Sequence, residues 1–206
     1  MLIPAMLFMM QQVKGNPFNT YLVTKVIDGD TFQTAEMMNI RFDTLDAPEL
    51  ANCGGMEAKE QLQKLIEGKK VRLDIQARDV NGRQVASVWA GKTWIDQKMI
   101  ESGWVVYSSS VVDKGHVLQE LDKKNEKEKI GLYAEKCTQY TNPDKPKCQI
   151  KGNIAGDWDH KGDKIYHAPG CAQYSSVRVE KWRGEEWFCN EKQAIEAGYR
   201  KSERCP

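Results

Sequence analysis

From Tyr21 onward, alternating apolar and polar residues predict three short strands. Tyr21–Asp28 alternates β-branched with polar residues and ends in an Asp-Gly-Asp turn, after which Thr31–Ala35 resumes the extended pattern. Two such runs around a tight turn predict a hairpin. A third strand is expected at Asn39–Phe42.

The period of the pattern then changes to that of a helix. Within Glu57–Ile66, apolar residues return every three or four positions on one face, and Gly68 follows as a stop signal. Two more strands are expected at Lys70–Ile75 and Val85–Ala90, joined by the turn-forming segment Asp79–Arg83. The pattern predicts a five-stranded sheet interrupted by one helix.

Two further helices and a second, smaller unit complete the predicted organisation. The helices are expected at Ile95–Ser102 and Val117–Lys129, whereas Thr141–Pro146 contains two prolines and cannot form regular structure. The second unit is a small α+β module, with strands near Lys164–Tyr166, Val177–Lys181 and Glu186–Phe188 and a helix at Glu191–Ala197. We expect four parts: an apolar segment and spacer at 1–20, a first domain at 21–136, a Pro-rich linker at 137–148, and the C-terminal module at 149–206.

The balance of charges limits the possible functions. Thirty basic and twenty-nine acidic residues give a net charge of +1, and 40% of the 206 residues are hydrophobic. The chain can therefore bury a core, which excludes a disordered protein. No surface-wide positive field attracts nucleic acid or an anionic membrane, so a polyanionic substrate requires a compact site with its own positive charge.

The cysteines and the first ten residues indicate an oxidising compartment. Six cysteines form an even set weighted toward the C-terminal third. Residues 1–10 are apolar and uncharged, with the length of the hydrophobic part of a signal and too few residues to span a bilayer. We interpret the protein as secreted or associated with the cell envelope, without a stable membrane span; a frayed tail is the alternative interpretation of residues 1–10.

Carboxylates and arginines gather at the ends of the predicted strands. Asp30 lies at the hairpin turn, Arg41 on the third strand, Asp46 and Glu49 in the loop after it, and Arg83 at the turn before the fifth strand. Two carboxylates with a backbone carbonyl and waters suit a hard cation. Each pair alone is weak evidence, because Asp-Gly turns are common.

In this order, the blocks resemble those of the staphylococcal nuclease family over roughly residues 21–134. The matching blocks are Val26–Thr31, Ile40–Phe42 continued by Asp46–Glu49, Asn81–Ala86, and Gly131–Tyr133 after a charged helix. The resemblance implies a five-stranded OB-fold barrel with helices. It also implies a Ca²⁺-dependent nuclease that hydrolyses phosphodiester bonds of DNA, RNA or both with little sequence specificity.

The resemblance assigns a role to each candidate residue. Asp30 and Asp46 would be carboxylate ligands of Ca²⁺, and Ala47 would offer its backbone carbonyl. Asp28 would brace this site from outside.

The catalytic assignments follow in the same way. Arg41 and Arg83 would donate to phosphate oxygens as charge develops, because a guanidinium group matches phosphate in a bidentate manner. Glu49 would orient or deprotonate the attacking water. Ser108–Val111 stands where the family has base-stacking tyrosines, so base stacking is not expected from this segment; Trp104 or Tyr107 are the alternatives.

The C-terminal module resembles a small tail found after some bacterial nuclease-like domains, and also a Cys/His zinc module of DNA-repair type. His167 and Cys171 have ligand spacing, but Ser202 occupies the place of a cysteine, so we expect a disulfide staple and not zinc. The simplest bridge joins Cys137 to Cys148, and Cys53 competes for either of them.

Three cysteines precede Gln149 and three follow it. Either each half keeps one free thiol, with Cys53 or Cys189 unpaired, or one bridge crosses between the halves.

Two function classes remain open at this point. The first is the nuclease, acting as a monomer on DNA or RNA. The second is a non-catalytic OB-fold protein that binds single strands and is attached to the envelope through its C-terminal module. An intact set of Asp30, Arg41, Asp46, Glu49 and Arg83 favours the nuclease, because a binding protein has no need of it.

Overall fold

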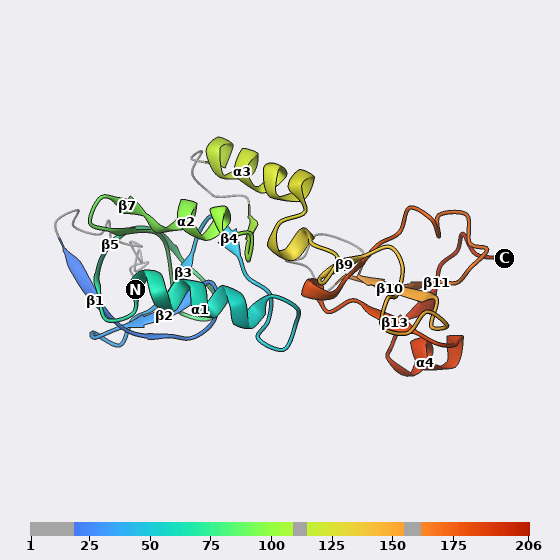
Figure 1. Cartoon of the computed structure of the whole chain (residues 1–206). Coiled ribbons are helices and arrows are strands. Elements are labelled where there is room, and N and C mark those ends of the chain that lie inside the picture. Colours follow the sequence, from blue (N-terminus) through green and yellow to red (C-terminus); the bar gives the residue numbers. More distant parts are fainter. Residues whose placement is uncertain (1–18, 109–114, 155–161) are drawn as a thin grey trace, which may run out of the picture.

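A closed five-stranded barrel forms the first part of the protein. A computed structural model describes residues 19–108, 115–154 and 162–206. The strands β1–β2, β2–β3, β1–β5 and β5–β6 pair antiparallel, and a parallel pairing of β3 with β6 closes the ring (Figure 1). The ring is built from β1 (Thr20–Val26), β2 (Thr31–Thr34), β3 (Asn39–Phe42), β5 (Lys70–Arg78) and β6 (Gln84–Ala90). The predicted five-stranded OB-fold barrel is confirmed.

Three helices accompany the barrel. They are α1 (Gly55–Ile66), α2 (Ile95–Glu101) and α3 (Gly115–Glu128). The first begins two residues before its expected start, directly after Gly54, whose φ of 89° is a left-handed conformation that favours glycine.

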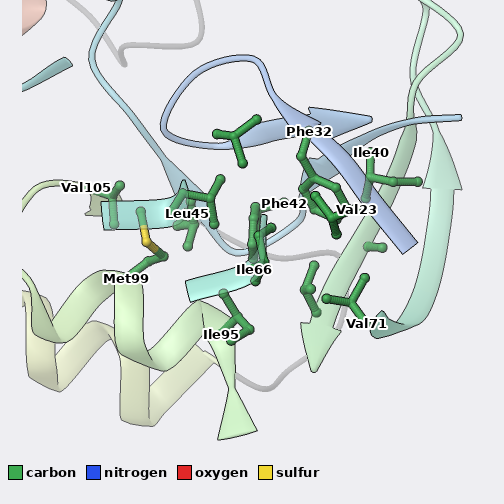
Figure 2. Close-up of a cluster of buried hydrophobic side chains, with 14 of the residues drawn as sticks. Val23, Phe32, Ile40, Phe42, Leu45, Ile66, Val71, Ile95, Met99 and Val105 are labelled. Carbon is green, nitrogen blue, oxygen red and sulfur yellow. The ribbon is translucent and has the colours of Figure 1, made fainter. Parts of the chain in front are cut away.

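The barrel core is filled from the strands, from one face of each of the first two helices and from Leu118 of α3. Its labelled side chains converge in Figure 2: Val23, Phe32, Ile40, Phe42, Leu45, Ile66, Val71, Ile95, Met99 and Val105. Asp96 is buried beside this core and accepts hydrogen bonds from Thr44 Oγ1 (2.7 Å), Ser87 Oγ (3.1 Å) and the Val88 N–H (2.9 Å). This carboxyl joins α2 to β6 and to the loop before β4.

Short strands outside the ring were not predicted. β4 (Leu45–Asp46) pairs with β8 (Val106–Tyr107), and β7 (Thr93–Trp94) extends the sheet beyond β6. Two residues are too few to show an alternating pattern, so the sequence carries no signal for them.

The C-terminal module contains a four-stranded sheet with its own small core. The order is β13-β10-β11-β14, with β14 parallel to β11. The elements are β10 (Ile150–Ile154), β11 (Lys164–His167), β13 (Glu186–Phe188), α4 (Glu191–Glu196) and β14 (Arg200–Lys201). The core consists of Ile150, Tyr166, Phe188, Ala194 and Tyr199.

One predicted strand of the module pairs outside the four-stranded sheet. The run expected at Val177–Lys181 shortens to β12 (Val179–Glu180), which pairs with β9 (Thr138–Gln139) at the start of the predicted linker. A 3₁₀ turn, η2 (Lys181–Arg183), follows β12, and another, η1 (Gly131–Tyr133), precedes β9. The barrel side and the C-terminal module are therefore joined by a two-stranded ladder.

Three disulfides pair all six cysteines: Cys53–Cys137, Cys148–Cys189 and Cys171–Cys205. The expected disulfide staple is confirmed. The alternative in which Cys53 pairs with Cys137 is confirmed as well. The simplest pairing, Cys137 with Cys148, was wrong, as was the expectation that Cys53 or Cys189 stays free. The folding of β9 against β12 turns the chain back on itself, so sequence proximity did not decide the partners.

Some sequence-based expectations lie outside the described residues. These are the apolar segment at 1–10 and most of the segment Ser108–Val111, of which only Ser108 is described. Within the described ranges, no helix is long and apolar enough to cross a membrane.

Candidate functional site

A buried aspartate at the β1–β2 turn is the centre of the candidate site. The Asp30 N–H donates to Asp28 Oδ1 (3.0 Å), which shapes the turn. The Asp30 carboxylate accepts hydrogen bonds from Thr31 Oγ1 (2.7 Å) and from the Ala47 N–H (3.0 Å). Gly29 is required here, because a Cβ would meet the Cβ atoms of Ala47 and of a helix α1 alanine.

Arg41 joins the two candidate metal ligands. Its Nη1 donates to Asp30 Oδ1 at 2.8 Å, and its Nη2 donates to Asp46 Oδ1 at 2.5 Å. The strand register explains this geometry, since Arg41 is the β3 partner of Thr31 in β2, next to Asp30. The sequence-predicted set of Asp30, Arg41 and Asp46 is thus held together by charge-assisted hydrogen bonds.

The site concentrates negative charge in a partly buried place. Burial and the neighbouring Asp30 carboxylate raise the pKa of Asp46 to about 8, although Arg41 acts in the opposite direction. Burial and Asp30 likewise raise the pKa of Asp28 to about 6. Burial alone would lower the pKa of Arg41, but Asp30 and Asp46 outweigh it and the pKa is raised. One guanidinium group does not balance these carboxylates, so the site favours binding of a further positive charge.

Arg83 is positioned by its own turn. Asp79 Oδ1 accepts the Asn81 and Arg83 N–H groups (2.9 and 2.8 Å), and Asp79 Oδ2 accepts from Arg83 Nε at 2.6 Å. Burial raises the pKa of Asp79, but the hydrogen bonds and charge of Arg83 outweigh it, so the pKa is lowered. Arg83 was predicted from the sequence, whereas the role of Asp79, four residues earlier in the same turn, was not.

Glu49 is exposed, in the loop between β4 and α1. The backbone of this loop is well held: the Asn52 N–H donates to the Glu49 carbonyl (2.8 Å), and Gly55 lies against the same carbonyl with no room for a Cβ. The Cys53–Cys137 bridge fixes the next turn of the loop. The candidate base therefore has an exposed side chain on a restrained backbone.

One cleft of about 760 Å³ brings these residues together with part of the C-terminal module. Its barrel side is lined by Asp28, Asp30, Arg41, Asp46, Ala47, Pro48, Glu49, Asn52 and Arg83. Its other side is lined by Ile154, Gly162, Asp163, Lys164, Trp182, Arg183 and Gly198. The second group was not predicted from the sequence. No local pattern marks those residues, because only the tertiary structure brings them near the barrel.

The alternative stacking residues do not line this cleft. Trp104 packs within the barrel core and against the cluster around Leu132, and Tyr107 belongs to β8, where its N–H donates to Asp122 Oδ2 (3.1 Å). Among the described residues, no group of three or more His, Cys, Asp or Glu side chains is arranged to hold a metal ion. A cation here would depend on two carboxylates, backbone oxygen and water.

Comparisons with known proteins identify relatives of the barrel. Residues 39–135 match the family model described as staphylococcal nuclease homologue. A thermonuclease of Staphylococcus hyicus is 35% identical over 95 residues, which are 41% of this chain and 56% of the relative. An uncharacterized endonuclease of Haemophilus influenzae is 29% identical over 147 residues, which are 68% of this chain and 79% of the relative.

The matches cover a smaller share of two other relatives. A probable endonuclease of Yarrowia lipolytica is 33% identical over 116 residues, 49% of this chain and 51% of that protein. An uncharacterized 38.1 kDa protein of Capnoides sempervirens is 32% identical over 112 residues, 54% of this chain and 31% of that protein. The chain thus spans between about a third and a little over half of the length of several relatives it matches.

Proposed function

Residues 39–135 belong to the staphylococcal nuclease family, and we propose that the whole chain is a Ca²⁺-dependent nuclease that hydrolyses phosphodiester bonds of DNA, RNA or both with little sequence specificity. Relatives named as thermonuclease or endonuclease support a nuclease function. The observation that carries the proposal is the fork of Arg41 between Asp30 and Asp46, in the same cleft as Glu49 and Arg83.

The donor set fits a hard divalent cation. Asp30 and Asp46 offer only oxygen atoms. Burial, and after it the neighbouring Asp30 carboxylate, raises the pKa of Asp46, and a bound cation would favour the ionised form. We assign these two carboxylates and the Ala47 carbonyl as its ligands. Bound there, Ca²⁺ would supply a fixed positive charge for the phosphate oxygens.

Each remaining side chain has a role that its position supports. Arg41 holds Asp30 and Asp46 in place through two of its five N–H groups and has others to donate to phosphate. Arg83, oriented by Asp79, donates to the phosphate from another side of the cleft. Glu49, exposed to solvent beside them, orients or deprotonates the water that attacks phosphorus.

We place this activity outside the cytoplasm. Three disulfides that together use every cysteine support an oxidising compartment. In that setting, a nuclease with low specificity would act on nucleic acid outside the cell or at its envelope, as a monomer.

Hydrolysis of single-stranded DNA with Ca²⁺ and then with EGTA tests the proposal. We expect cleavage with Ca²⁺, its loss in EGTA, and its loss in Asp46→Ala, because that variant removes one of two carboxylate ligands. Glu36→Ala, in the exposed β2–β3 turn, is the matched control and should keep full activity. Unchanged turnover in EGTA would contradict the metal assignment. Binding without cleavage by the unaltered protein would favour the non-catalytic alternative.

A further inference from the structure

The C-terminal module contacts the loop that carries Glu49. This loop, residues 47–54 between β4 and α1, reaches from the barrel toward the module (Figure 1). There, Asn52 Nδ2 donates to the Trp182 carbonyl at 3.3 Å. Gly184 lies so close that a Cβ on it would stand 3.4 Å from Asn52 Nδ2. Loop and module therefore meet at the Asn52 side chain.

Asn52 also holds the backbone of the loop. Its N–H donates to the Glu49 carbonyl (2.8 Å), and its own carbonyl accepts from the N–H of Gly55, the first residue of α1 (3.1 Å). One residue thus links the backbone of Glu49, the start of α1 and, through its side chain, the module. A displacement of Asn52 would move the backbone of Glu49 with it.

The acceptor on the module side is fixed relative to the barrel. The Lys181 N–H donates to the Cys137 carbonyl (2.8 Å), and β12 pairs with β9. Trp182 is buried in one cluster with Val106, Leu132 and Cys137. Because the Trp182 carbonyl has a defined position, a hydrogen bond to it restrains the loop.

We propose that Asn52 is a positioning residue through which docking of the C-terminal module holds Glu49 in its working position. This inference rests on the proposed nuclease function and deepens it. A base must lie within hydrogen-bond reach of the water that it activates, and a restrained loop keeps it there. The module thereby acts on catalysis through the loop.

Asn52→Ala removes the side-chain bond and keeps the backbone groups. It should lower kcat on single-stranded DNA by about tenfold with KM unchanged, because the base is less well placed. Asn142→Ala is the matched control: its Nδ2 likewise donates to a carbonyl, that of Cys148 (3.2 Å), and its side chain does not line the cleft. This control should keep the kcat of the unaltered protein. A raised KM with a normal kcat in Asn52→Ala would overturn the proposal and make Asn52 a substrate-binding residue.

A double-mutant cycle with Glu49 separates positioning from a general disturbance. Glu49 is exposed, so Glu49→Gln should fold and should lower kcat by itself. In that background, Asn52→Ala should change kcat by less than about twofold, since the group that it positions is gone. An equal loss in both backgrounds would show that Asn52 does not act through Glu49.

Gly184→Ala reaches the same contact from the module. Gly184 has a φ of 82°, which disfavours other residues, so the added Cβ strains the turn that carries the Trp182 carbonyl. This variant should lower kcat where Glu49 is present and not in Glu49→Gln. The comparison stands even if circular dichroism shows that Asn52→Ala does not fold. Equal losses with and without Glu49 would again contradict the proposal.

Hydrogen exchange of the loop, measured without Ca²⁺ or substrate, separates this inference from the proposed function. Exchange at the N–H groups of residues 52 and 55 should be about tenfold faster in Asn52→Ala and unchanged in Asn142→Ala. Faster exchange with no hydrolysis by the unaltered protein would refute the nuclease and retain the restraint. Hydrolysis with unchanged exchange in Asn52→Ala would retain the nuclease and refute the restraint.

Discussion

At the scale of single residues, one guanidinium group organises the candidate site. Arg41 contacts Asp30 and Asp46 at once and thereby fixes the distance between a carboxylate of the β1–β2 turn and one of β4. Arg83 contacts neither of them and is oriented instead by Asp79. The two arginines therefore differ: the loss of Arg41 disturbs the proposed metal ligands as well, whereas the loss of Arg83 isolates a contact to substrate.

Arg83→Ala should lower kcat by about 10² to 10³ while the protein stays folded, because a donor aimed at developing charge contributes mainly in the transition state. Steady-state kinetics on single-stranded DNA measures this. Arg78→Ala is the control in the same hairpin, since its Nε donates to the Gly82 carbonyl and its side chain does not line the cleft. A normal kcat with a raised KM would make Arg83 an ordinary binding residue.

The buried carboxyl of Asp96 should make the stability of the fold depend on pH. Burial raises its pKa to about 6 from the ordinary 3.8, so the folded state favours the protonated form. The resulting stabilisation is fully present below pH 3.8 and is lost as the pH rises through about 6. Asp96→Asn should remove this dependence, because the hydroxyl groups of Thr44 and Ser87 can turn to accept from its amide.

Urea unfolding of both proteins from pH 4 to pH 7 measures the effect. The stability difference between variant and unaltered protein should move in favour of the variant by at most about 3 kcal/mol over that range. A constant difference across the range would show that Asp96 titrates alike in folded and unfolded chains.

At the scale of elements, the loop between β4 and α1 depends on a bridge to a distant part of the chain. The Cys53–Cys137 disulfide spans 84 residues and fixes the loop four residues after Glu49. Replacing both cysteines with serine should cost about 2–5 kcal/mol of stability. It should also lower kcat at temperatures where the protein remains folded, because the restrained backbone positions Glu49.

The Cys171–Cys205 pair provides the comparison, since neither of its cysteines lines the cleft that holds Glu49. Its double serine variant should lose stability without a change in kcat, measured by thermal unfolding and by initial rates. If both variants lost kcat equally, the restraint on the Glu49 loop would have no special role.

The same scale shows how far the sequence predicts the structure. The strands of the barrel and helices α1 to α3 follow from alternation, apolar periodicity and turn residues, which are local properties. The strand expected at Val177–Lys181 is present as the shorter β12, but its pairing with β9 was not predicted, because β9 lies in a segment with no strand pattern.

Part of the candidate site can be predicted from the sequence, and part depends on tertiary structure. Asp30, Arg41 and Asp46 lie within seventeen residues, in the β1–β2 turn, β3 and β4, so their order in the sequence already places them together. Lys164 and Arg183 reach the same cleft from more than a hundred residues away. Only the docking of the C-terminal module determines that, and docking depends on contacts that have no local signature.

At the scale of the whole molecule, the barrel and the C-terminal module share buried surface. Trp182 extends from the module into the cluster of Val106, Leu132 and Cys137. Such shared burial couples the unfolding of the two parts into one transition.

Trp182→Ala should therefore destabilise the protein by roughly 3–5 kcal/mol. In this variant the barrel and the C-terminal module should unfold in two separate transitions. Urea unfolding followed by far-UV and near-UV circular dichroism checks this, because coincident curves indicate a single transition. Trp89→Ala, a partly buried barrel residue stacked on Trp94, should lower stability and leave the curves coincident. Coincident curves in the Trp182 variant would mean that other contacts couple the two parts.

The pairing of the cysteines also decides how the protein can be made. Of the six cysteines, Cys53 and Cys137 leave a ribosome or translocon first. They are bonded to each other in the folded protein, so oxidation in order of emergence gives the correct disulfide. The other two bridges interleave: Cys148 must wait for Cys189 while Cys171 emerges between them. In-order oxidation would join Cys148 to Cys171 and require later thiol–disulfide exchange. The yield of native protein should thus depend on a disulfide isomerase for its second half and only on an oxidant for its first.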